Sequence, residues 1–503
     1  MPEANINSRF LTPRVFTSLP LAGNYAAAIT LALLALSPFL VLTTALSLFQ
    51  PVLMEELSAS RFQLQLTSGL SNAGYAFGAV AAADLFQRIP ARHLYIFCES
   101  GFVVSSVLAL SAREIGLFMA GVILQGLFTG MLLVLALPPL ILTQGIHQLP
   151  TTSAVISIGL FGMVTAGPVI GGLIGTYSGW RLLYTSIAVL AAIGLAVGTM
   201  AFAPNEPPAK GARFDWTAIP LAVAATALPF FGVSWLTRGN FSDWEFIAPV
   251  VVGILAGMLL LVSQYVKTTP LMPVRIISNT LPVTGTLNAM VVGAAFTTLL
   301  ELVEVYMLQV SGYSPVKTGL LIAPEIGGIV VSAILFSKVM STRLTPYLAL
   351  SGLLSIVAAA GVLLALTPSN VTTIVPIVAI LLGYGAGAGV VPGLFLAGFS
   401  VYSTQLGPTF ALVELVRSEA AFLIGPVLVH LAVIQGSFTG GFQLAVEIML
   451  AFTGASAIVL PGVFLLGGAR PEPPDLAGWL AGTSTGYHSP PLGSAIRKSA
   501  PTP

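Results

Sequence analysis

Apolar residues gather in long runs along this chain instead of alternating with polar ones. The runs are about 20 residues long and are separated by short polar breaks or by Pro and Gly. That length suits a helix crossing the hydrocarbon core of a bilayer, whereas the strands of a membrane barrel are about half as long and alternate in polarity. The pattern predicts fourteen transmembrane helices, at 25–48, 64–86, 93–112, 115–141, 153–176, 181–202, 217–236, 246–266, 282–307, 317–337, 345–366, 372–396, 408–434 and 442–467.

The positions of lysine and arginine support this number of spans. With the N-terminus in the cytoplasm, thirteen of these residues fall in inner segments, five in outer loops and one, Arg417, inside a span. Cytoplasmic loops of membrane proteins carry such an excess. An even number of spans puts both termini on one side. We therefore expect an integral protein of the plasma (inner) membrane with both termini cytoplasmic.

The composition excludes several classes of function. Only 7% of the 503 residues are charged and 56% are hydrophobic, so most of the surface must face lipid. The net charge of +1 predicts no nucleic-acid partner. The four histidines lack ligand spacing, and the single cysteine, Cys98, makes neither a disulfide framework nor a thiolate zinc site, so no metal or cofactor is predicted. Neither a Walker phosphate loop nor a catalytic constellation is present, so we expect neither ATP as the energy source nor an enzyme.

Glycines concentrate in the fifth predicted span. Gly167 and Gly171 lie four residues apart, with Pro168 and Gly172 beside them. Small residues at this spacing let another backbone approach closely, and the proline removes one helical hydrogen bond. Ordinary helix packing is one explanation of these glycines. The full order Gly-Pro-x-x-Gly-Gly, followed by Gly-Trp-Arg at 179–181, closely resembles the fifth-span antiporter motif of the major facilitator superfamily.

Other segments match that family in the same order. Asp84, Arg88 and Arg92 fit its acidic and basic signature between spans 2 and 3, and the resemblance implies that they form a cytoplasmic gate. The further matches are Thr43-Thr44, Pro51, Leu57, Gln125-Gly126, Phe214-Asp215-Trp216 and parts of 306–320. The match covers about residues 35 to 430. Within the superfamily, the sequence resembles the fourteen-span drug:proton antiporters.

The resemblance implies an all-α membrane protein with the major facilitator fold: two six-helix lobes plus two extra linker helices, about fourteen transmembrane helices in all. Gly425-Pro426 in span 13 repeats Gly167-Pro168 of span 5, as parallel repeats of that fold would require. After Arg470 the chain is rich in Pro, Gly and Ser, which predicts a disordered cytoplasmic tail. The expected regions are a cytoplasmic segment (1–24), the N-terminal lobe (25–203), the linker with two extra spans (204–280), the C-terminal lobe (281–469) and the tail (470–503).

Two positions depart from the family pattern in a way that concerns the mechanism. Leu42 stands where the family's first span carries an aspartate, and Val122 stands where its fourth span carries an arginine. Both charges are associated in the family with proton coupling. A proton-driven cycle in this chain would therefore need a different carboxyl group.

Acidic residues inside the spans are the candidates for that group. A charge in lipid is costly, so these side chains should face the interior of the bundle or a water-filled cavity. Glu301 and Glu304 share one helix face, and their repulsion and burial would favour one retained proton; alternatively, span 9 ends before them and both meet water. Glu414 and Arg417, also three residues apart, are either a structural pair or part of the transport site. The remaining candidates for coupling or substrate contact are Glu99 and Glu325.

These features predict a secondary active transporter that exports apolar or amphipathic small molecules by alternating access. Protons are the expected coupling ion, and the substrate is expected near the midplane between the lobes. One alternative is a specific metabolite carrier or uniporter that has lost proton antiport, which Leu42 and Val122 favour. The other is a membrane sensor that transports nothing, which the acids within the spans disfavour. The sequence names neither the substrate nor the oligomeric state.

Overall fold

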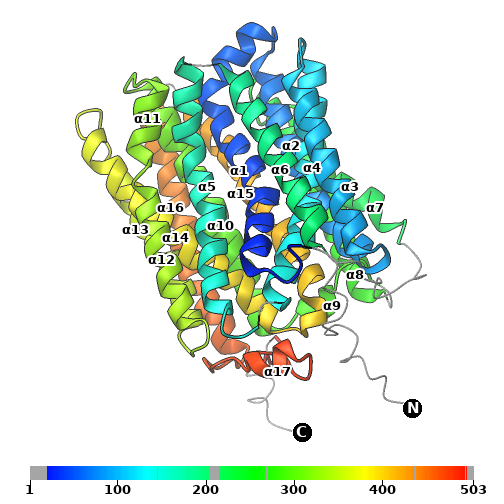
Figure 1. The fold of residues 1–503 in the computed structure, drawn as a ribbon. Coiled ribbons are helices and arrows are strands. Elements are labelled where there is room, and N and C mark those ends of the chain that lie inside the picture. The colour runs from blue at the N-terminus through cyan, green and yellow to red at the C-terminus, as the bar shows by residue number, and fades with distance from the viewer. Residues whose placement is uncertain are drawn as a thin grey trace.

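The computed structural model of the chain describes residues 20–143, 145–177, 179–202, 215–267, 270–435, 438–492 and 494. In this part of the chain the regular elements are helices, with a single isolated bridge between Asn279 and Pro491 and no β-strand. Figure 1 shows the long helices running side by side, with α17 at the same end of the bundle as the start of α1. We call that end the inner end and the opposite one the outer end, following the predicted orientation.

The first six long helices form one group, which we call the N-lobe. Within it α2 packs on α4, α1 packs on α5, and α3 packs on both α4 and α6. The bounds of these helices are α1 (Tyr25–Glu56), α2 (Arg61–Arg88), α3 (Ala91–Leu110), α4 (Ile115–Thr143), α5 (Leu149–Tyr177) and α6 (Trp180–Ala201).

A second group, the C-lobe, is built in a similar way around α10 and α14. The helix α10 packs on α14 and α15, while α12 and α13 also pack on α14. Its elements are α10 (Thr280–Gln309), α11 (Pro315–Ile322), α12 (Glu325–Val339), α13 (Thr345–Leu363), α14 (Val371–Phe399), the 3₁₀ turn η3 (Ser403–Gln405), α15 (Leu406–Ile434) and α16 (Phe438–Leu466).

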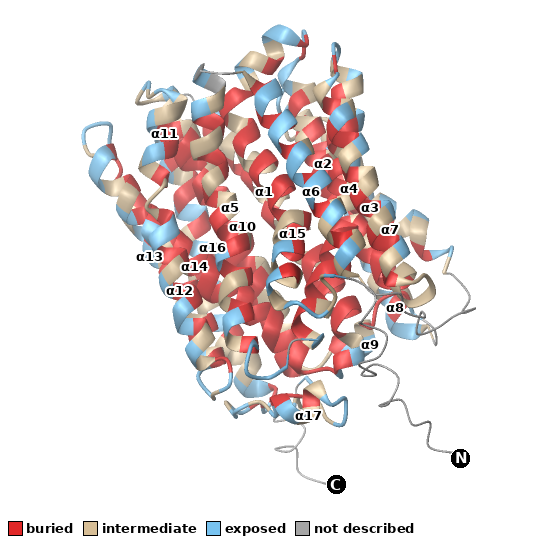
Figure 2. Cartoon of the chain, in the orientation of Figure 1, coloured by how far each residue is buried: buried red, intermediate tan, exposed pale blue. Residues whose placement is uncertain are grey.

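Two helices between the lobes, α7 (Ala218–Trp235) and α8 (Trp244–Val266), form a hairpin, and the short α9 (Val274–Ile277) follows them. The helix α7 packs on α2 and also touches α15, so the hairpin contacts both lobes. Most side chains of α8 are exposed, including Leu255, Met258 and Val262. Figure 2 shows buried residues concentrated inside the bundle. An exposed apolar helix of this kind suits a surface in contact with lipid.

Local signals explain where several helices begin. Ser60 accepts a hydrogen bond from the backbone N–H of Gln63, and the Gln63 side chain accepts one from the N–H of Ser60, which satisfies two free donors at the start of α2. Ser314 caps α11 by accepting a hydrogen bond from the backbone N–H of Lys317, with Pro315 in the first turn. Gly179 joins α5 to α6 with a φ of 72°, a backbone conformation that side chains other than glycine rarely adopt.

The described helices agree with the predicted spans. Twelve of them are long and apolar enough to cross a membrane. Two further helices, α2 and α15, have 28 and 29 residues but are more polar, and α15 carries three charged residues. They are long enough to cross a bilayer, since about 20 residues suffice. Together these helices are compatible with fourteen spans, with α11 and α12 forming one span that is broken at Ala323 and Pro324.

The prediction of a disordered tail is wrong for residues 470–492. Trp479 of α17 (Leu476–Leu480) is fully buried, and its Nε1 donates a hydrogen bond of 2.8 Å to the carbonyl oxygen of Val401. The backbone N–H of Tyr487 donates to the carbonyl oxygen of Phe399 at 3.0 Å. These two aromatic residues bury enough apolar surface to hold the segment in place, although its proline-rich composition predicts disorder. The predicted boundary at 203–204, Phe214 and the N-terminal residues 1–19 lie outside the described residues.

Candidate functional site

A cavity of about 90 Å³ lies between the two lobes. Helices α1, α2, α4 and α5 form one wall, and α10, α14 and α15 form the other. Its lining extends from Thr44, well along α1, to Ile141, near the inner end of α4. Roughly 10–15 Å³ accommodates one water molecule, so the cavity can hold several. Its walls are mainly apolar and aromatic, including Phe161, Phe296, Phe395, Phe410 and Phe422.

The charged groups of this cavity form one compact cluster. Arg417 Nη2 donates a hydrogen bond of 2.5 Å to Glu414 Oε2, and Arg417 Nε lies 3.1 Å from both carboxylate oxygens. From the opposite lobe, the hydroxyl of Tyr75 donates to Glu414 Oε2 at 3.3 Å. The Tyr75 ring stacks on Phe39, with ring centroids 5.7 Å apart. The sequence predicted the Glu414 and Arg417 pair, but nothing in it pointed to Tyr75 as a partner.

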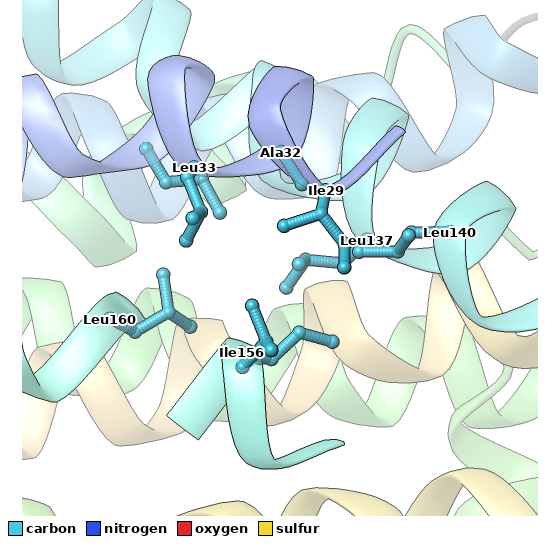
Figure 3. A pocket seen from close by; sticks show the side chains of 9 residues that line it. Ile29, Ala32, Leu33, Leu137, Leu140, Ile156 and Leu160 are labelled. Atoms are coloured by element: carbon cyan, nitrogen blue, oxygen red, sulfur yellow. The ribbon is translucent and has the colours of Figure 1, made fainter. Parts of the chain in front are cut away.

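A second, much smaller cavity of about 10 Å³ adjoins the first. Figure 3 shows the aliphatic side chains of α1, α4 and α5 that surround it, among them Ile29, Leu33 and Leu140. Leu36, Leu137, Ile156 and Leu160 line both cavities. The apolar character of the central cavity therefore continues between α1, α4 and α5.

Glu301 and Glu304 both lie inside α10, which continues beyond them to Gln309. Glu304 is buried, and its Oε2 accepts a hydrogen bond of 3.1 Å from the Ser47 hydroxyl on α1 of the other lobe. Glu301 is half-buried, and its carboxylate lies against Gly425 of α15. The two acids therefore meet different helices.

Glu325 and Glu99 have different surroundings. Glu325 is the first residue of α12, is fully buried and is hydrogen-bonded through Oε1 to the Thr165 hydroxyl on α5 of the other lobe. Glu99 is almost fully buried inside the N-lobe, beside Gly194 of α6. Within the described residues, neither carboxylate oxygen of Glu99 has a hydrogen-bond partner. Glu325 thus lies at the interface between lobes, and Glu99 lies away from it.

The glycines of α5 leave no room for side chains, as their spacing predicts. A Cβ atom on Gly171 would lie 2.8 Å from the carbonyl oxygen of Ala45, and one on Gly167 would overlap the Thr44 hydroxyl. A Cβ on Gly172 would lie 2.6 Å from the carbonyl oxygen of Pro315 in the other lobe. The backbone of α5 therefore contacts α1 on one side and α11 on the other, and both contacts are near the outer end.

The predicted gate residues lie on helices, not in a loop. α2 continues to Arg88 and α3 begins at Ala91, so only Ile89 and Pro90 separate the two helices. Arg88 Nη2 donates to Asp84 Oδ1 at 2.6 Å, so this ion pair is contained within α2. Arg92 is the second residue of α3. The three residues lie together at the inner end.

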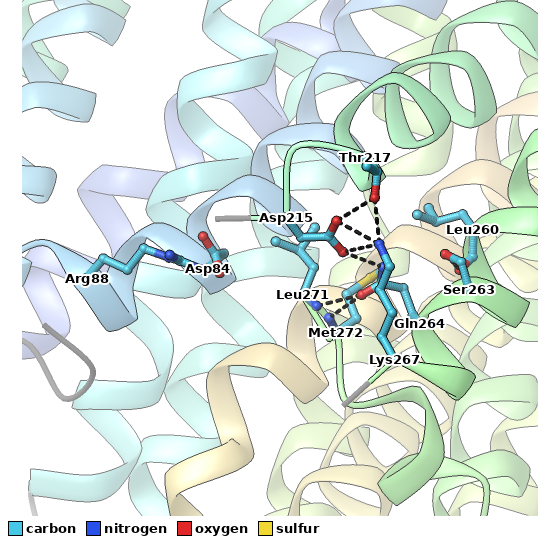
Figure 4. Close-up of polar contacts among 10 residues, drawn as sticks. All are labelled: Asp84, Arg88, Asp215, Thr217, Leu260, Ser263, Gln264, Lys267, Leu271 and Met272. Atoms are coloured by element: carbon cyan, nitrogen blue, oxygen red, sulfur yellow. Dashed lines mark hydrogen bonds and ion pairs between the residues drawn. The ribbon is translucent and has the colours of Figure 1, made fainter. Parts of the chain in front are cut away.

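A polar network ties the extra hairpin to the C-lobe connection (Figure 4). Lys267 Nζ donates to both carboxylate oxygens of Asp215, at 2.6 and 2.7 Å. The Gln264 side chain donates to Asp215 at 3.1 Å and accepts from the backbone N–H groups of Leu271 and Met272. Burial raises the pKa of Asp215, but the hydrogen bonds from Lys267, Thr217 and Gln264 outweigh it and lower that pKa to about 2.

A family model described as the Major Facilitator Superfamily matches residues 31–426. This region is most of the chain. The chain belongs to the Major Facilitator Superfamily. The matched region includes the cavity, the acids at the lobe interface and the α5 glycines, so each is part of a major facilitator core.

Curated relatives within this family carry names that refer to drug resistance or export. The chain is 26% identical over 336 residues to a multidrug resistance protein B homolog of Mycobacterium tuberculosis, a match covering 66% of this chain and 60% of that protein. It is 27% identical to the tetracenomycin C resistance and export protein of Streptomyces glaucescens, over 58% of this chain and 54% of the relative. The drug efflux pump JefA of M. tuberculosis is 24% identical, over 69% of each chain. The chain thus spans little more than half the length of the first two relatives.

Solved structures of major facilitator proteins share the fold. The human organic anion transporter MFSD10 (TETRAN) has a TM-score of 0.61 at 14% identity, covering 87% of this chain and 99% of that one. A peptide transporter POT in complex with sulfate has the same TM-score at 16% identity, covering 89% and 98%. At these identities the likeness concerns the fold alone. Both neighbours are transporters, and the family assigns this chain to transport and not to catalysis.

The two departures from the family's charges lie in apolar surroundings. Leu42 and Val122 are both buried within the N-lobe. The partners that this chain supplies at the lobe interface, Ser47, Thr165 and Tyr75, were missed in the sequence. Hydroxyl side chains are common in membrane helices, and only the packing of two distant segments shows which of them face a carboxylate.

Proposed function

We propose that this transporter exports apolar or amphipathic small molecules by alternating access, in exchange for protons. The observation that carries the proposal is the cavity between the lobes, whose walls are apolar and aromatic around a single ion pair. Binding sites near the midplane between repeats are the general arrangement for secondary transporters. The names of the drug-resistance relatives support export as the direction.

The charges of the cavity support a substrate class. Glu414 is compensated by Arg417 three residues away, so the pair contributes no net charge to the wall. A cavity of this kind selects for apolar surface and aromatic stacking, with Tyr75 and the ion pair available for one polar group of the ligand. This chemistry favours amphipathic compounds over small charged metabolites.

Buried carboxyl groups are the proposed carriers of the coupling proton. Glu304 and Glu325 each contact a hydroxyl group of the opposite lobe, so a change in their protonation would act where the lobes separate. Glu301 lies one turn from Glu304 and belongs to the same group. Glu99, buried inside the N-lobe, is a further candidate. Asp84, Arg88 and Arg92 are proposed to form the inner gate, with both termini in the cytoplasm.

One observation favours a second function. The aspartate and arginine that the related antiporters carry are replaced by buried Leu42 and Val122. A carrier that moves one substrate down its gradient needs no proton site, and this replacement would suit it. In such a carrier Glu304 and Glu325 would serve only to hold the lobes together.

Efflux of ethidium from cells that lack their own drug pumps tests the proposed path. Leu40 of α1 lines the cavity, and Leu40→Trp would fill it. Val104 of α3 is 66% exposed on the apolar surface, so Val104→Trp is a matched control. We expect cells with the wild type or Val104→Trp to clear the dye and cells with Leu40→Trp to retain it. Wild-type clearance by Leu40→Trp, at equal amounts in the membrane, would exclude this cavity as the path.

A further inference from the structure

Two carboxyl groups of the C-lobe meet hydroxyl groups of the N-lobe at separate points of the interface. Glu304 of α10 is bonded to Ser47 of α1 at 3.1 Å, and Glu325 of α12 is bonded to Thr165 of α5. Glu304 is 6% exposed and Glu325 is 0% exposed. Both contacts therefore join the lobes through a buried acid, and both lie beyond the midpoint of α1 or α5 toward the outer end.

The protons of these contacts can be counted. The Thr165 oxygen also lies 3.2 Å from the carbonyl oxygen of Phe161, and the Ser47 oxygen lies 3.3 Å from that of Thr44. A hydroxyl group has one proton and can donate only once. An ionised carboxylate would compete with the carbonyl for that proton. A protonated carboxyl instead donates to the hydroxyl oxygen, and the hydroxyl then donates to its own helix, so both bonds form.

The surroundings of the two acids contain no compensating cation among the described residues. The ionisable neighbours acting on Glu304 are Glu301 and Glu325, both acids, and Glu325 Oε2 has no hydrogen-bond partner in the described part of the chain. Two negative charges in such a place would repel each other and lose their hydration. The acidic and basic groups on neighbouring helices also include Glu56, paired with Arg181, Arg417, paired with Glu414, Lys317, over the Tyr313 ring, His430, against Phe241, Lys338, in the last turn of α12, Glu419, half-buried in α15, and the exposed Glu55 and Glu447.

The helix carrying Glu325 is broken beside it. α11 ends at Ile322 and α12 begins at Glu325, because Pro324 has no backbone N–H to continue the ladder. The α11 half packs against α5, where a Cβ on Gly319 would lie 2.7 Å from the carbonyl oxygen of Pro168. The break lets α11 and α12 move separately when the contact of Glu325 is made or lost.

From this geometry we infer that Glu304–Ser47 and Glu325–Thr165 are two proton-operated latches that hold the outer end closed. With the outer end open, each carboxylate takes a proton from the outer solution and becomes a neutral carboxyl, which bonds to its hydroxyl partner and draws the lobes together. Loss of both protons toward the cavity, whose wall includes Val164 next to Thr165, leaves two unpaired anions and releases the latches. The inference rests on the proposed proton-coupled transport and gives its protons a mechanical role.

Distances between spin labels on the two lobes test the latches. Ser111 and Ser369 are exposed on outer connections of the N-lobe and the C-lobe, and both would be changed to Cys in full-length Cys98→Ala protein. We expect a short distance at acidic pH and a longer one at alkaline pH. Glu304→Gln with Glu325→Gln, whose amides imitate the protonated acids, should keep the distance short at both. Glu447→Gln, on an exposed face of α16, is the control and should leave the pH response intact.

The hydroxyl partners give a second, independent variant. Ser47→Ala with Thr165→Val removes the acceptors and leaves the acids in place, so the distance should be long even at acidic pH. A pH response of the double Gln variant equal to that of the wild type, or a short distance without the two hydroxyls, overturns the latches.

Transport of ethidium by the same proteins in liposomes separates this inference from the proposed function. Transport driven by a pH gradient with label distances that do not respond to pH overturns the latches and leaves the function standing. Label distances that respond to pH in the wild type but not in the double Gln variant support the latches. If a pH gradient nevertheless drives no ethidium transport, proton-driven efflux is overturned and the latches still stand.

Discussion

The hydroxyl of Tyr75 on α2 donates a hydrogen bond of 3.3 Å to Glu414 on α15, so a side chain of one lobe is bonded to the ion pair of the other. The ion pair within α15 would form without Tyr75, since Arg417 lies on the same helix. The hydrogen bond from Tyr75 therefore contributes a contact between lobes that can change during transport without leaving a charge unpaired.

Removing this hydroxyl should weaken transport without unfolding the protein. We expect Tyr75→Phe to reduce ethidium efflux about fivefold, equivalent to roughly 1 kcal/mol, the typical net contribution of one hydrogen bond. Tyr347→Phe is the control, because Tyr347 is 56% exposed on α13. Efflux by Tyr75→Phe equal to that of the control would mean that the bond between the lobes has no part in the cycle.

The packing of α5 predicts a difference between two glycines of one helix. A Cβ on Gly171 would lie 2.8 Å from a backbone oxygen of α1, whereas the nearest atom to a Cβ on Gly162 is 3.8 Å away. Gly171→Ala should therefore cost about 1–3 kcal/mol and slow efflux, while Gly162→Ala should be neutral or slightly stabilising. Gly167→Leu should abolish efflux while the protein still reaches the membrane. Thermal unfolding in detergent compares Gly171→Ala with Gly162→Ala, and equal unfolding midpoints would contradict the close contact of Gly171 with α1.

Much of the fold could be predicted from the sequence, because one physical requirement governs it. In lipid a segment must satisfy its backbone polar groups internally and present apolar side chains, so long apolar runs mark helical spans whichever helices they pack against. The close approach at Gly171 could also be predicted, since only small residues permit it. In contrast, the partners Ser47 and Thr165 depend on which faces of distant helices meet. The order of the segment around Trp479 could not be predicted either, because it depends on a contact with the distant Val401 that the sequence does not show.

The segment around α17 is predicted to be part of the folded structure. Trp479→Ala would remove a fully buried indole and its hydrogen bond to Val401, at a cost of about 3–5 kcal/mol. Trp244→Ala, at a tryptophan that is 75% exposed, should cost far less. The unfolding midpoints of the two variants in detergent measure the difference. If both melted at the same temperature, α17 would not contribute to the stability of the C-lobe.

The network around Asp215 gives a prediction for the pH dependence of stability. Its pKa of about 2 in the folded chain lies below the ordinary value of 3.8, so its contribution is present above pH 3.8 and is lost as pH falls toward 2. We expect Asp215→Asn to lower the free energy of unfolding by about 1 kcal/mol from neutral pH down to roughly pH 4. Glu245→Gln, on the exposed part of α8, is the control. If the difference in unfolding free energy between the wild type and Asp215→Asn instead changed between neutral pH and pH 5, the lowered pKa of Asp215 would be contradicted.

Ethidium transport by the purified protein in liposomes is the decisive test of proton-coupled export. Ethidium is suitable because its charge does not change with pH, so an acidic lumen cannot trap it without a carrier. Proton-coupled export predicts that liposomes with an acidic lumen accumulate ethidium above its outside concentration, and that accumulation ceases when a proton ionophore collapses the gradient. Protein-free liposomes should not accumulate the dye. Equilibration of ethidium at the same rate and to the same level with and without the pH gradient would contradict proton-coupled export and identify a carrier without proton exchange.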